Sequence, residues 1–258
     1  MTEAGTTPDA QPPLSPGRSR SGLYSLQSFA GTIVIAVFVI TFIVQAFQIP
    51  SESMEKTLLI GDYLLVDKAH YGHSGVWSWL LPYRPIRRQE IIVFRYPVNP
   101  QQHFVKRVIA VPGDRVRLVN KHVYVNGVRQ NDAYATFKEA WPDRFRDEFP
   151  EGGFYGDRIS AKWSMQVRKL TEDGELIVPE DSYFALGDNR DDSYDSRYWG
   201  FVPRENIVGR PLMIYWSMDR NDIAVAHPLP SDRLSSLTVD VTQLLNCLRW
   251  HRMLRIPQ

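Results

Sequence analysis

Residues 29–47 read FAGTIVIAVFVITFIVQAF and carry no charge, and the polar sequence QIPSESM follows at residues 48–54. At about 1.5 Å of rise per residue, a helix over this run is roughly 28 Å long, close to the thickness of a bilayer's hydrocarbon core. The run therefore predicts a membrane-spanning helix. The hydroxyl of Ser53, a few residues beyond it, would reach only substrates presented at the membrane surface.

The residues before the apolar run predict its orientation. Residues 1–27 are polar and rich in Pro, Ser, Gly and Thr, a composition typical of a disordered tail. Arg18 and Arg20 lie on this side of the run and favour a cytoplasmic N-terminus, with the rest of the chain exported. We therefore expect a cytoplasmic tail over residues 1–27, a single-pass anchor over residues 28–49 and an extracytoplasmic domain over residues 50–258.

A cleavable signal peptide is the alternative to a retained anchor. Val44-Gln45-Ala46 is similar to a cleavage site for such a peptide. However, the apolar run is longer than the apolar core of most signal peptides, and a long polar tail precedes it. These two features favour the retained anchor.

The bulk composition argues against several kinds of partner and cofactor. The 258 residues carry 30 Lys and Arg against 29 Asp and Glu, and this net charge of +1 gives no indication of a nucleic-acid partner. Cys247 is the only cysteine, so the chain has no intramolecular disulfide and no cysteine-based metal site. The six histidines show no spacing typical of metal ligands. We expect no metal and no other cofactor.

The chain after the apolar run is predicted to be mainly β structure. Eighteen prolines, sixteen glycines and many short apolar runs are typical of strands joined by frequent turns. Strands are expected over residues 63–67, 90–96, 103–111, 115–118, 122–125, 181–186 and 211–217. Turns are expected at Asn120-Lys121, Asn126-Gly127 and Asp173-Gly174. The regular strand pattern stops at residue 132. Residues 132–180 are therefore expected to form an inserted lobe.

Two further segments leave alternatives open. Residues 71–88 combine aromatic residues with arginines, which suits the headgroup region of a membrane and equally suits a loop with core tryptophans. Residues 235–257 contain spaced apolar residues followed by basic ones. This tail predicts an amphipathic helix that lies on the membrane or packs on the domain.

Ser53 needs a base before its hydroxyl becomes a good nucleophile. His70 and His73 are the nearest histidines, but neither has a recognisable setting. Lys106 is a candidate because burial penalises the charged amine and lowers its pKa by as much as ~3–5 units. Strand alternation places apolar residues two positions away on either side of Lys106 on its own face. The same pattern also allows the amine to reach solvent or to pair with a distant carboxylate.

Lys56 is a second candidate base, because residues 53–56 fit the S-x-x-K pattern of penicillin-recognising enzymes. Those enzymes also need Ser-Asp-Asn and Lys-Thr-Gly elements, and this sequence contains neither. An exposed lysine would moreover stay charged. The sequence therefore favours Lys106.

Four blocks of sequence resemble the bacterial type I signal peptidases, which are membrane-anchored serine endopeptidases of the Ser/Lys type. The blocks are residues 50–58 (PSESMEKTL), 61–68 (GDYLLVDK), 105–114 (VKRVIAVPGD) and 185–200 (ALGDNRDDSYDSRYWG). Residues 123–127 (VYVNG) and 249–252 (RWHR) are also similar to that family. The resemblance implies a mainly β catalytic domain of the signal-peptidase and LexA-like fold with an inserted lobe, preceded by one N-terminal transmembrane helix.

The resemblance also implies which role each residue of the site has in the reaction. Ser53 corresponds to the nucleophile and Lys106 to the general base. Ser51 and the backbone N–H of Ser53 correspond to the oxyanion hole, where loss of one donor typically costs ~10²–10³ in rate. Ser193 corresponds to a serine that hydrogen-bonds the base lysine.

Three charged residues of the fourth block complete the implied site. Asp195 and Arg197 correspond to a pair that braces it, and Asp188 is assigned to the same supporting group. Without the resemblance, this stretch reads as a solvated loop with local hydrogen bonds.

The chain departs from the family pattern at three places. Many members have Gly where this chain has Glu52, and Pro where it has Lys56. These two charges near the nucleophile are expected to influence the pH optimum. An Arg-Gly-Asp sequence of the family appears here as Arg88-Gln89-Glu90, which changes the local turn.

The implied function is the removal of N-terminal signal peptides from secretory preproteins after a small-x-small sequence. The implied location is the bacterial inner (plasma) membrane, in contact with the lipid bilayer and close to the translocation machinery. Two other functions are compatible with parts of the pattern. A self-cleaving repressor of the related fold would carry a DNA-binding module where the apolar run stands. The other is a non-enzymatic, membrane-tethered β-domain scaffold, and the presence of Ser53, Lys106 and Ser193 together argues against it.

Overall fold

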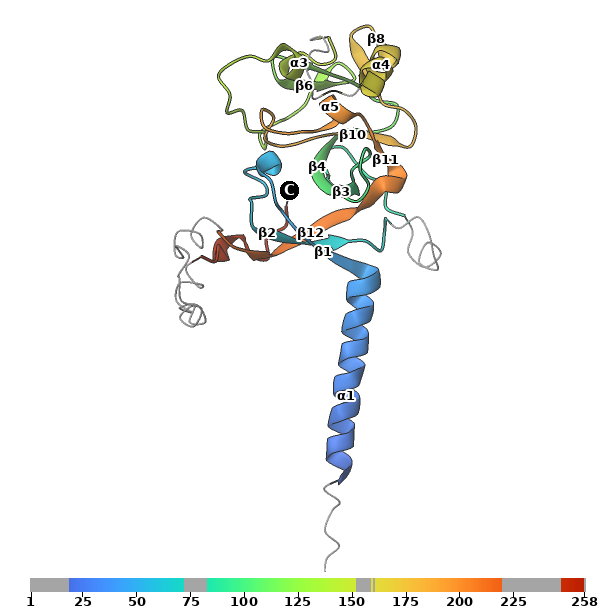
Figure 1. The fold of residues 1–258 in the computed structure, drawn as a ribbon, viewed down its shortest axis with the longest axis vertical. Coiled ribbons are helices and arrows are strands. Elements are labelled where there is room, and N and C mark those ends of the chain that lie inside the picture. The colour runs from blue at the N-terminus through green and yellow to red at the C-terminus, as the bar shows by residue number, and fades with distance from the viewer. Residues whose placement is uncertain (1–18, 72–82, 152–158, 160, 220–246, 258) are drawn as a thin grey trace, which may run out of the picture. The chain divides into compact units, whose positions relative to one another are not determined.

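The computed structural model describes residues 19–71, 83–151, 159, 161–219 and 247–257 (Figure 1). The chain divides into two compact units, Met1–Thr41 and Phe42–Gln258. The disordered tail expected over residues 1–27 lies outside the described residues up to residue 18 and is wrong over residues 19–27, which are helical. Of the aromatic segment at residues 71–88, residues 72–82 lie outside the described part.

The apolar run begins as a helix and ends as a strand. Helix α1 (Ser19–Phe38) continues into a π-helical turn (Val39–Ile43), and Tyr24–Ile43 is apolar enough and long enough to cross a membrane. The expected anchor over residues 28–49 is wrong at its end, because strand β1 (Val44–Gln48) pairs with strand β2 (Asp62–Asp67) in a sheet of the second unit. Cross-strand hydrogen bonds from β2 satisfy this backbone in place of helical ones.

Strand β1 also bears on the choice between an anchor and a cleavable peptide. Its five residues pair antiparallel with β2 (Asp62–Asp67), from Val44 opposite Asp67 to Gln48 opposite Tyr63. A cut after Ala46 would remove the first three residues of this strand and leave an edge of the sheet unpaired. The pairing therefore favours a retained helix.

The first sheet carries the expected strands in an order that sequence alone does not give. Its seven strands run β1-β2-β12-β3-β4-β10-β11, all of them in antiparallel pairs. Its other members are β3 (Ile91–Arg95), β4 (His103–Ala110), β10 (Ser182–Leu186), β11 (Val202–Pro203) and β12 (Ile207–Ser217). The mainly β catalytic domain is confirmed, and the predicted strands agree with the structure to within a few residues.

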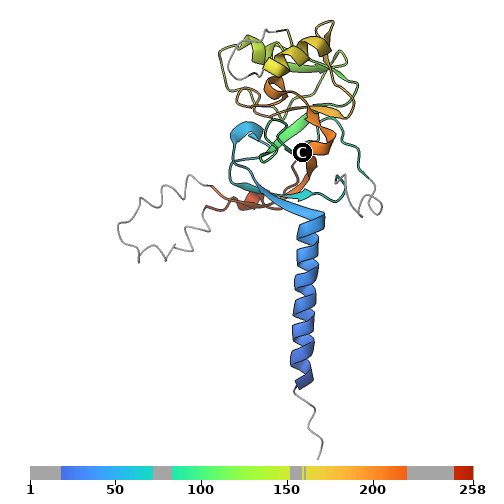
Figure 2. The same ribbon diagram turned by 45° about the vertical axis from the view of Figure 1, so that its right-hand side comes forward.

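The second sheet forms a lobe of the second unit, together with the short helices α3 (Arg144–Asp147) and α4 (Ala161–Leu170) (Figure 2). Its order is β7-β6-β5-β9-β8. The strands are β5 (Arg115–Val119), β6 (His122–Val125), β7 (Val128–Arg129), β8 (Thr171–Glu172) and β9 (Glu175–Ile177). The expected lobe over residues 132–180 therefore begins too late, because β5 pairs directly with β9.

All three predicted turns are confirmed by their backbone angles. The φ angles are +49° and +69° at Asn120-Lys121, +52° and +74° at Asn126-Gly127, and +52° and +75° at Asp173-Gly174. Two consecutive residues with positive φ make the tight turn whose twist matches that of paired strands. Asn, Asp and Gly tolerate this conformation better than most residues, which is why the sequence marks these turns.

A small apolar cluster lies beneath the turn that carries Ser53. It contains Ile49, Met54, Leu58, Leu64, Val66, Ile91, Val93 and Ile214. Met54 and Leu58 are almost fully buried in this cluster, one on each side of the polar residues that follow the turn. The hydrophobic effect thus fixes the backbone on which the serine stands.

The end of the chain does not form the expected amphipathic helix where it is described. Residues 220–246 lie outside the described part, and residues 247–257 contain only a short 3-10 turn (Trp250–Arg252). Leu248 bridges to Met218, and the backbone at Leu254 and Arg255 hydrogen-bonds to Ile214 of β12. The segment is held to the sheet by its backbone, which an α-helix does not permit.

Gln89 occupies a left-handed backbone conformation, with φ of +68°, at the position where the family pattern given in the sequence analysis has Gly. A residue with a Cβ carries a cost of about 1 kcal/mol in this region. We therefore expect Gln89→Gly to raise the free energy of unfolding by about 1 kcal/mol, measured by urea denaturation. Gln89→Ala is the matched control and should bring no gain, because it keeps the Cβ. Equal effects of the two variants would contradict the backbone explanation.

Candidate active site

Ser53 lies at the centre of a 3-10 turn (Glu52–Met54) that starts directly after the extended Ser51. The amides of Thr57 and Leu58 both donate to the carbonyl of Met54, which continues the turn beyond the serine. The carbonyl of Ser53 accepts from the amide of Asn189, 3.1 Å away, in the loop after β10. Local turn geometry and one long-range hydrogen bond thus fix the serine backbone.

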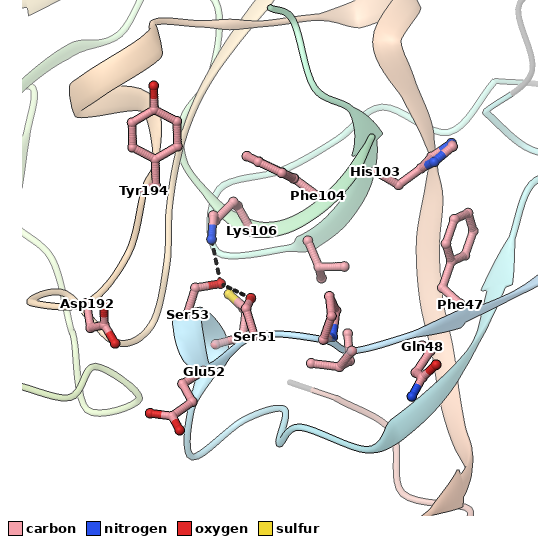
Figure 3. Close-up of a pocket in the computed structure, with 14 residues that line it drawn as sticks. Phe47, Gln48, Ser51, Glu52, Ser53, His103, Phe104, Lys106, Asp192 and Tyr194 are labelled. Carbon is pink, nitrogen blue, oxygen red and sulfur yellow. Dashed lines mark hydrogen bonds between the residues drawn. The ribbon is translucent and has the colours of Figure 1, made fainter. Parts of the chain in front are cut away.

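Lys106 approaches this serine from the middle of β4, opposite Ile92 of β3. Its Nζ donates to Ser53 Oγ at 2.5 Å, as the dashed line in Figure 3 shows. The two side chains are only 4% and 9% exposed, respectively. The structure therefore brings together the two residues that the sequence predicted as nucleophile and base. Lys56, the other candidate, is exposed.

Burial is the main cause of the lowered pKa of Lys106. Loss of hydration lowers its pKa from 10.5 to about 8, since the interior penalises the charged form. The carboxylates of Asp195, Asp188 and Asp192 act in the opposite direction, and the Arg197 guanidinium adds to the lowering. About a tenth of the amine is then neutral at pH 7, far more than for a lysine in water, and a neutral amine has the lone pair that a base needs.

Ser51 lies beside the two reacting groups at the mouth of the site. Its Oγ is 3.3 Å from Ser53 Oγ, within hydrogen-bonding distance. Ser51 is exposed, whereas Ser53 is buried. A hydroxyl in this place can turn toward an oxygen of a bound substrate, as an oxyanion donor must.

Ser193 is buried close to the site, but the expected hydrogen bond to Lys106 is not formed. Within the described residues its Oγ has no hydrogen-bond partner. A Cβ added at Gly187 would overlap both Ser193 Oγ and the carbonyl of Ser53. Gly187 is therefore a functional residue that the sequence analysis missed, because the need for close approach arises only when the two loops meet.

Asp195 and Arg197 form the buried ion pair that the sequence predicted. Arg197 donates from Nε to Asp195 Oδ1 at 2.9 Å and from Nη2 to Oδ2 at 2.8 Å. Burial alone would raise the pKa of Asp195, but the Arg197 charge and hydrogen bonds lower it overall. Arg197 also donates to the carbonyls of Arg190 and Arg146, so the pair ties the loop after β10 to the lobe.

Asp188 pairs with a residue that the sequence analysis did not single out. Arg107 donates from Nε to Asp188 Oδ1 at 2.8 Å and from Nη2 to Oδ2 at 2.7 Å. Arg107 follows Lys106 on β4 and points to the opposite face. Thr57 Oγ1 also donates to Asp188 Oδ2, at 2.5 Å. Asp188 thus braces the serine loop and does not contact the base directly.

A cavity of about 410 Å³ opens beside the reacting groups. Residues 47–50 line one wall and residues 103–106 the other, with the serine turn between them and Tyr194 nearby (Figure 3). Both walls are extended or strand-like, and β1 leads directly into the first. An extended peptide fits such a space, since its backbone can hydrogen-bond to a neighbouring strand and its side chains alternate.

Within the described residues, no group of three or more His, Cys, Asp or Glu side chains is placed to hold a metal ion. The Ser53 hydroxyl and the Lys106 amine are the two groups that the site brings into direct contact. A hydroxyl activated by a neutral amine performs acyl transfer: it attacks a carbonyl carbon, and the amine carries the proton to the leaving group.

Residues 23–216 match the family described as "Signal peptidase, peptidase S26". Similar sequences include signal peptidase I of Aquifex aeolicus, which is 39% identical over 72% of this chain and 81% of its own length. Signal peptidase I of Buchnera aphidicola from Acyrthosiphon pisum is 31% identical over 80% of this chain and 79% of its own. Signal peptidase I of Pseudomonas aeruginosa is 33% identical over 74% of this chain and 71% of its own.

The lowered pKa of Lys106 also makes the free energy of unfolding depend on pH. The unfolded chain binds the lysine proton more tightly than the folded one, so folding carries a cost below pH 8 that fades as the pH approaches 10.5. Lys106→Met is expected to raise the free energy of unfolding at pH 7 by up to about 3 kcal/mol, with a smaller gain at about pH 10. Urea denaturation at both pH values measures this.

Lys56→Met is the matched control for that experiment. Lys56 is exposed, so its replacement should change the free energy of unfolding little at either pH. A Lys106→Met protein that is no more stable than the wild type at pH 7 would mean that the amine is not held in a desolvated state.

Proposed function

The chain belongs to the signal peptidase family, peptidase S26, and is a serine-type peptidase that removes signal peptides from preproteins; on this premise we propose that Ser53 is its nucleophile and Lys106 its general base. The observation that carries the proposal is the 2.5 Å contact between Lys106 Nζ and Ser53 Oγ. Its second support is the burial that lowers the pKa of the amine to about 8.

The reaction follows from this geometry. Neutral Lys106 takes the proton of Ser53 as the hydroxyl oxygen attacks the scissile carbonyl carbon. The oxygen of the tetrahedral intermediate is stabilised by the Ser51 hydroxyl and the backbone N–H of Ser53. The Lys106 ammonium then gives its proton to the departing amine of the mature chain. The same lysine, neutral again, activates a water that hydrolyses the ester and frees Ser53.

Ser193 has a supporting part in this scheme. Its buried hydroxyl has no other hydrogen-bond partner in the described residues, so it is available to accept from the Lys106 amine. That bond forms when Ser53 is acylated and no longer accepts from the amine. It holds the lone pair of Lys106 toward the attacking water. Asp195 and Arg197 keep the loop of Ser193 in place through their buried pair.

The cavity beside Ser53 takes the end of the signal peptide. We place this segment as an extended strand between residues 47–50 and residues 103–106. Alternate side chains then enter the site and set the preference for a small-x-small sequence. Ile49, Phe104 and Val105 contribute to the two walls, and we expect them to restrict the size of the side chain next to the scissile bond.

The helix at Tyr24–Ile43 accounts for the membrane association that is typical of the family. We propose that it is a retained single-pass anchor with a cytoplasmic N-terminus, because two arginines precede it. The catalytic unit then lies on the exported side of the bacterial inner membrane. There it lies close to the lipid surface and meets preproteins as they leave the translocation machinery.

The proposed dyad is tested by incubating the detergent-solubilised protein with a secretory preprotein. Ser53→Ala and Lys106→Ala are each expected to lower kcat at least ~10³-fold without unfolding the catalytic unit, since both groups act together in the reaction. Lys106→Arg should fail equally, because the guanidinium stays charged. The Ser53→Ala protein serves as the blank for contaminating proteases. Near-normal cleavage by Lys106→Arg would exclude the neutral-lysine mechanism.

The charge state of Lys106 also predicts a pH profile. Only the neutral amine is a base, so kcat/KM should rise about tenfold per pH unit below the pKa of about 8 and level off above it. Initial rates from about pH 6 to pH 9.5 measure the profile, and circular dichroism at each pH checks that the fold is intact. Lys56→Met should keep the tenfold rise per pH unit, because its exposed charge can shift only the position of the curve. A rate that stays constant from about pH 6 to pH 8 would contradict the assignment.

A further inference from the structure

The last described residues lie beside the loop that follows the proposed nucleophile, although Arg252 and Asp62 of that loop are 190 residues apart in sequence. Residues 247–257, here called the C-terminal segment, lie along β12 and reach the loop of residues 54–62 (Figure 1). Two basic side chains of this segment, Arg249 and Arg252, point at that loop. Neither takes part in the reaction derived above.

Arg252 makes the central contact. It is 5% exposed, and its Nε and Nη2 donate to Asp62 Oδ1 at 3.2 Å and Oδ2 at 2.6 Å. The same Nη2 donates to the carbonyl of Thr57 at 2.9 Å. Asp62 is fully buried and also accepts from the amide of Leu59 and the hydroxyl of Ser217. One guanidinium therefore joins the start of the loop to its end.

Arg249 adds a second attachment to the same loop. Its Nη2 donates to the carbonyl of Ile60 and, at 2.6 Å, to that of Met218 at the end of β12. Gly61 allows this approach: its φ is +87°, and an added Cβ would overlap the Met218 carbonyl. The loop is thus closed by groups that come from the far end of the chain.

Thr57 connects this attachment to the reacting serine. Its carbonyl accepts from Arg252, its hydroxyl donates to Asp188, and its amide donates to the carbonyl of Met54. Met54 is the residue after Ser53. The serine turn is therefore held between two buried ion pairs, Arg107 with Asp188 and Arg252 with Asp62.

We propose that the C-terminal segment is a positioning element of the active site, in which Arg252 fixes the loop that places Ser53 against Lys106. The inference rests on the proposed function, because it assigns a role toward the same serine. A displacement of about 1 Å in a reacting group can cost ~10²-fold in rate even when the change is remote from the chemistry. A loosened loop should therefore lower kcat and leave the binding of the preprotein nearly unchanged.

The test compares Arg252→Gln and Arg252→Lys with the wild type in the full-length, detergent-solubilised protein. We expect kcat to fall by ~10–100-fold for Arg252→Gln and by ~5–10-fold for Arg252→Lys, with KM changed by less than ~3-fold in both. The lysine variant keeps the charge but lacks the planar fork that reaches Asp62 and Thr57 together. It keeps the test valid if the glutamine variant does not fold.

Three further measurements separate positioning from general stability. Arg255→Gln, an exposed neighbour in the same segment, is the matched control and should keep the wild-type kcat. Amide hydrogen exchange should rise at Leu58 and Leu59 in Arg252→Lys and not in Arg255→Gln. Guanidinium added to Arg252→Ala should restore part of its kcat, because it can occupy the site left by the side chain.

The outcomes are distinct from those of the nucleophile test. If the wild type cleaves the preprotein, Ser53→Ala does not, and Arg252→Lys keeps the wild-type kcat while folded, only the positioning role is wrong. If Ser53→Ala still cleaves, the proposed nucleophile itself is wrong. A kcat that falls only in proportion to the fraction of unfolded protein would also overturn the positioning role.

Discussion

The contact between the Lys106 amine and the Ser53 hydroxyl depends on keeping water away from an ionisable group. A lysine in water is charged and cannot accept a proton, and only burial makes the neutral form accessible near neutral pH. The position of Lys106 in the middle of β4, opposite Ile92 of β3, achieves this, and the residue is only 4% exposed. Burial of the amine lowers the free energy of unfolding below pH 8, and the apolar core around both sheets offsets this loss.

The polar residues around the dyad follow from the same constraint. A loop that must approach a buried amine cannot be held by exposed contacts, so its charged residues are buried in pairs. Arg107 with Asp188, Arg197 with Asp195, and Arg252 with Asp62 each bury a guanidinium against a carboxylate. Such pairs gain little net stability over apolar residues of the same size, but breaking one is costly. They specify loop geometry, which is what the serine requires.

Much of this architecture could be read from local sequence. The hairpin turns at Asn120-Lys121 and Asp173-Gly174 are confirmed because their backbone angles depend on the turn residues themselves. The strand around Lys106 was predicted because alternation is a local property. The end of the apolar run was predicted wrongly, since residues 44–48 are as compatible with a helix as with a strand. Pairing with β2, which the local pattern does not contain, decides between them.

By itself, the sequence determined the apolar helix, the mainly β character and the identities of the proposed nucleophile and base. The first two follow from composition and periodicity, which act over a few residues, and the nucleophile and base were assigned from the resemblance of short motifs to the signal peptidases. Only the tertiary structure decided that β5 pairs with β9, that Ser193 Oγ has no hydrogen-bond partner among the described residues, and that Arg252 closes the loop of residues 54–62. Those features arise from side chains far apart in the chain, and their meeting depends on the packing of the whole domain.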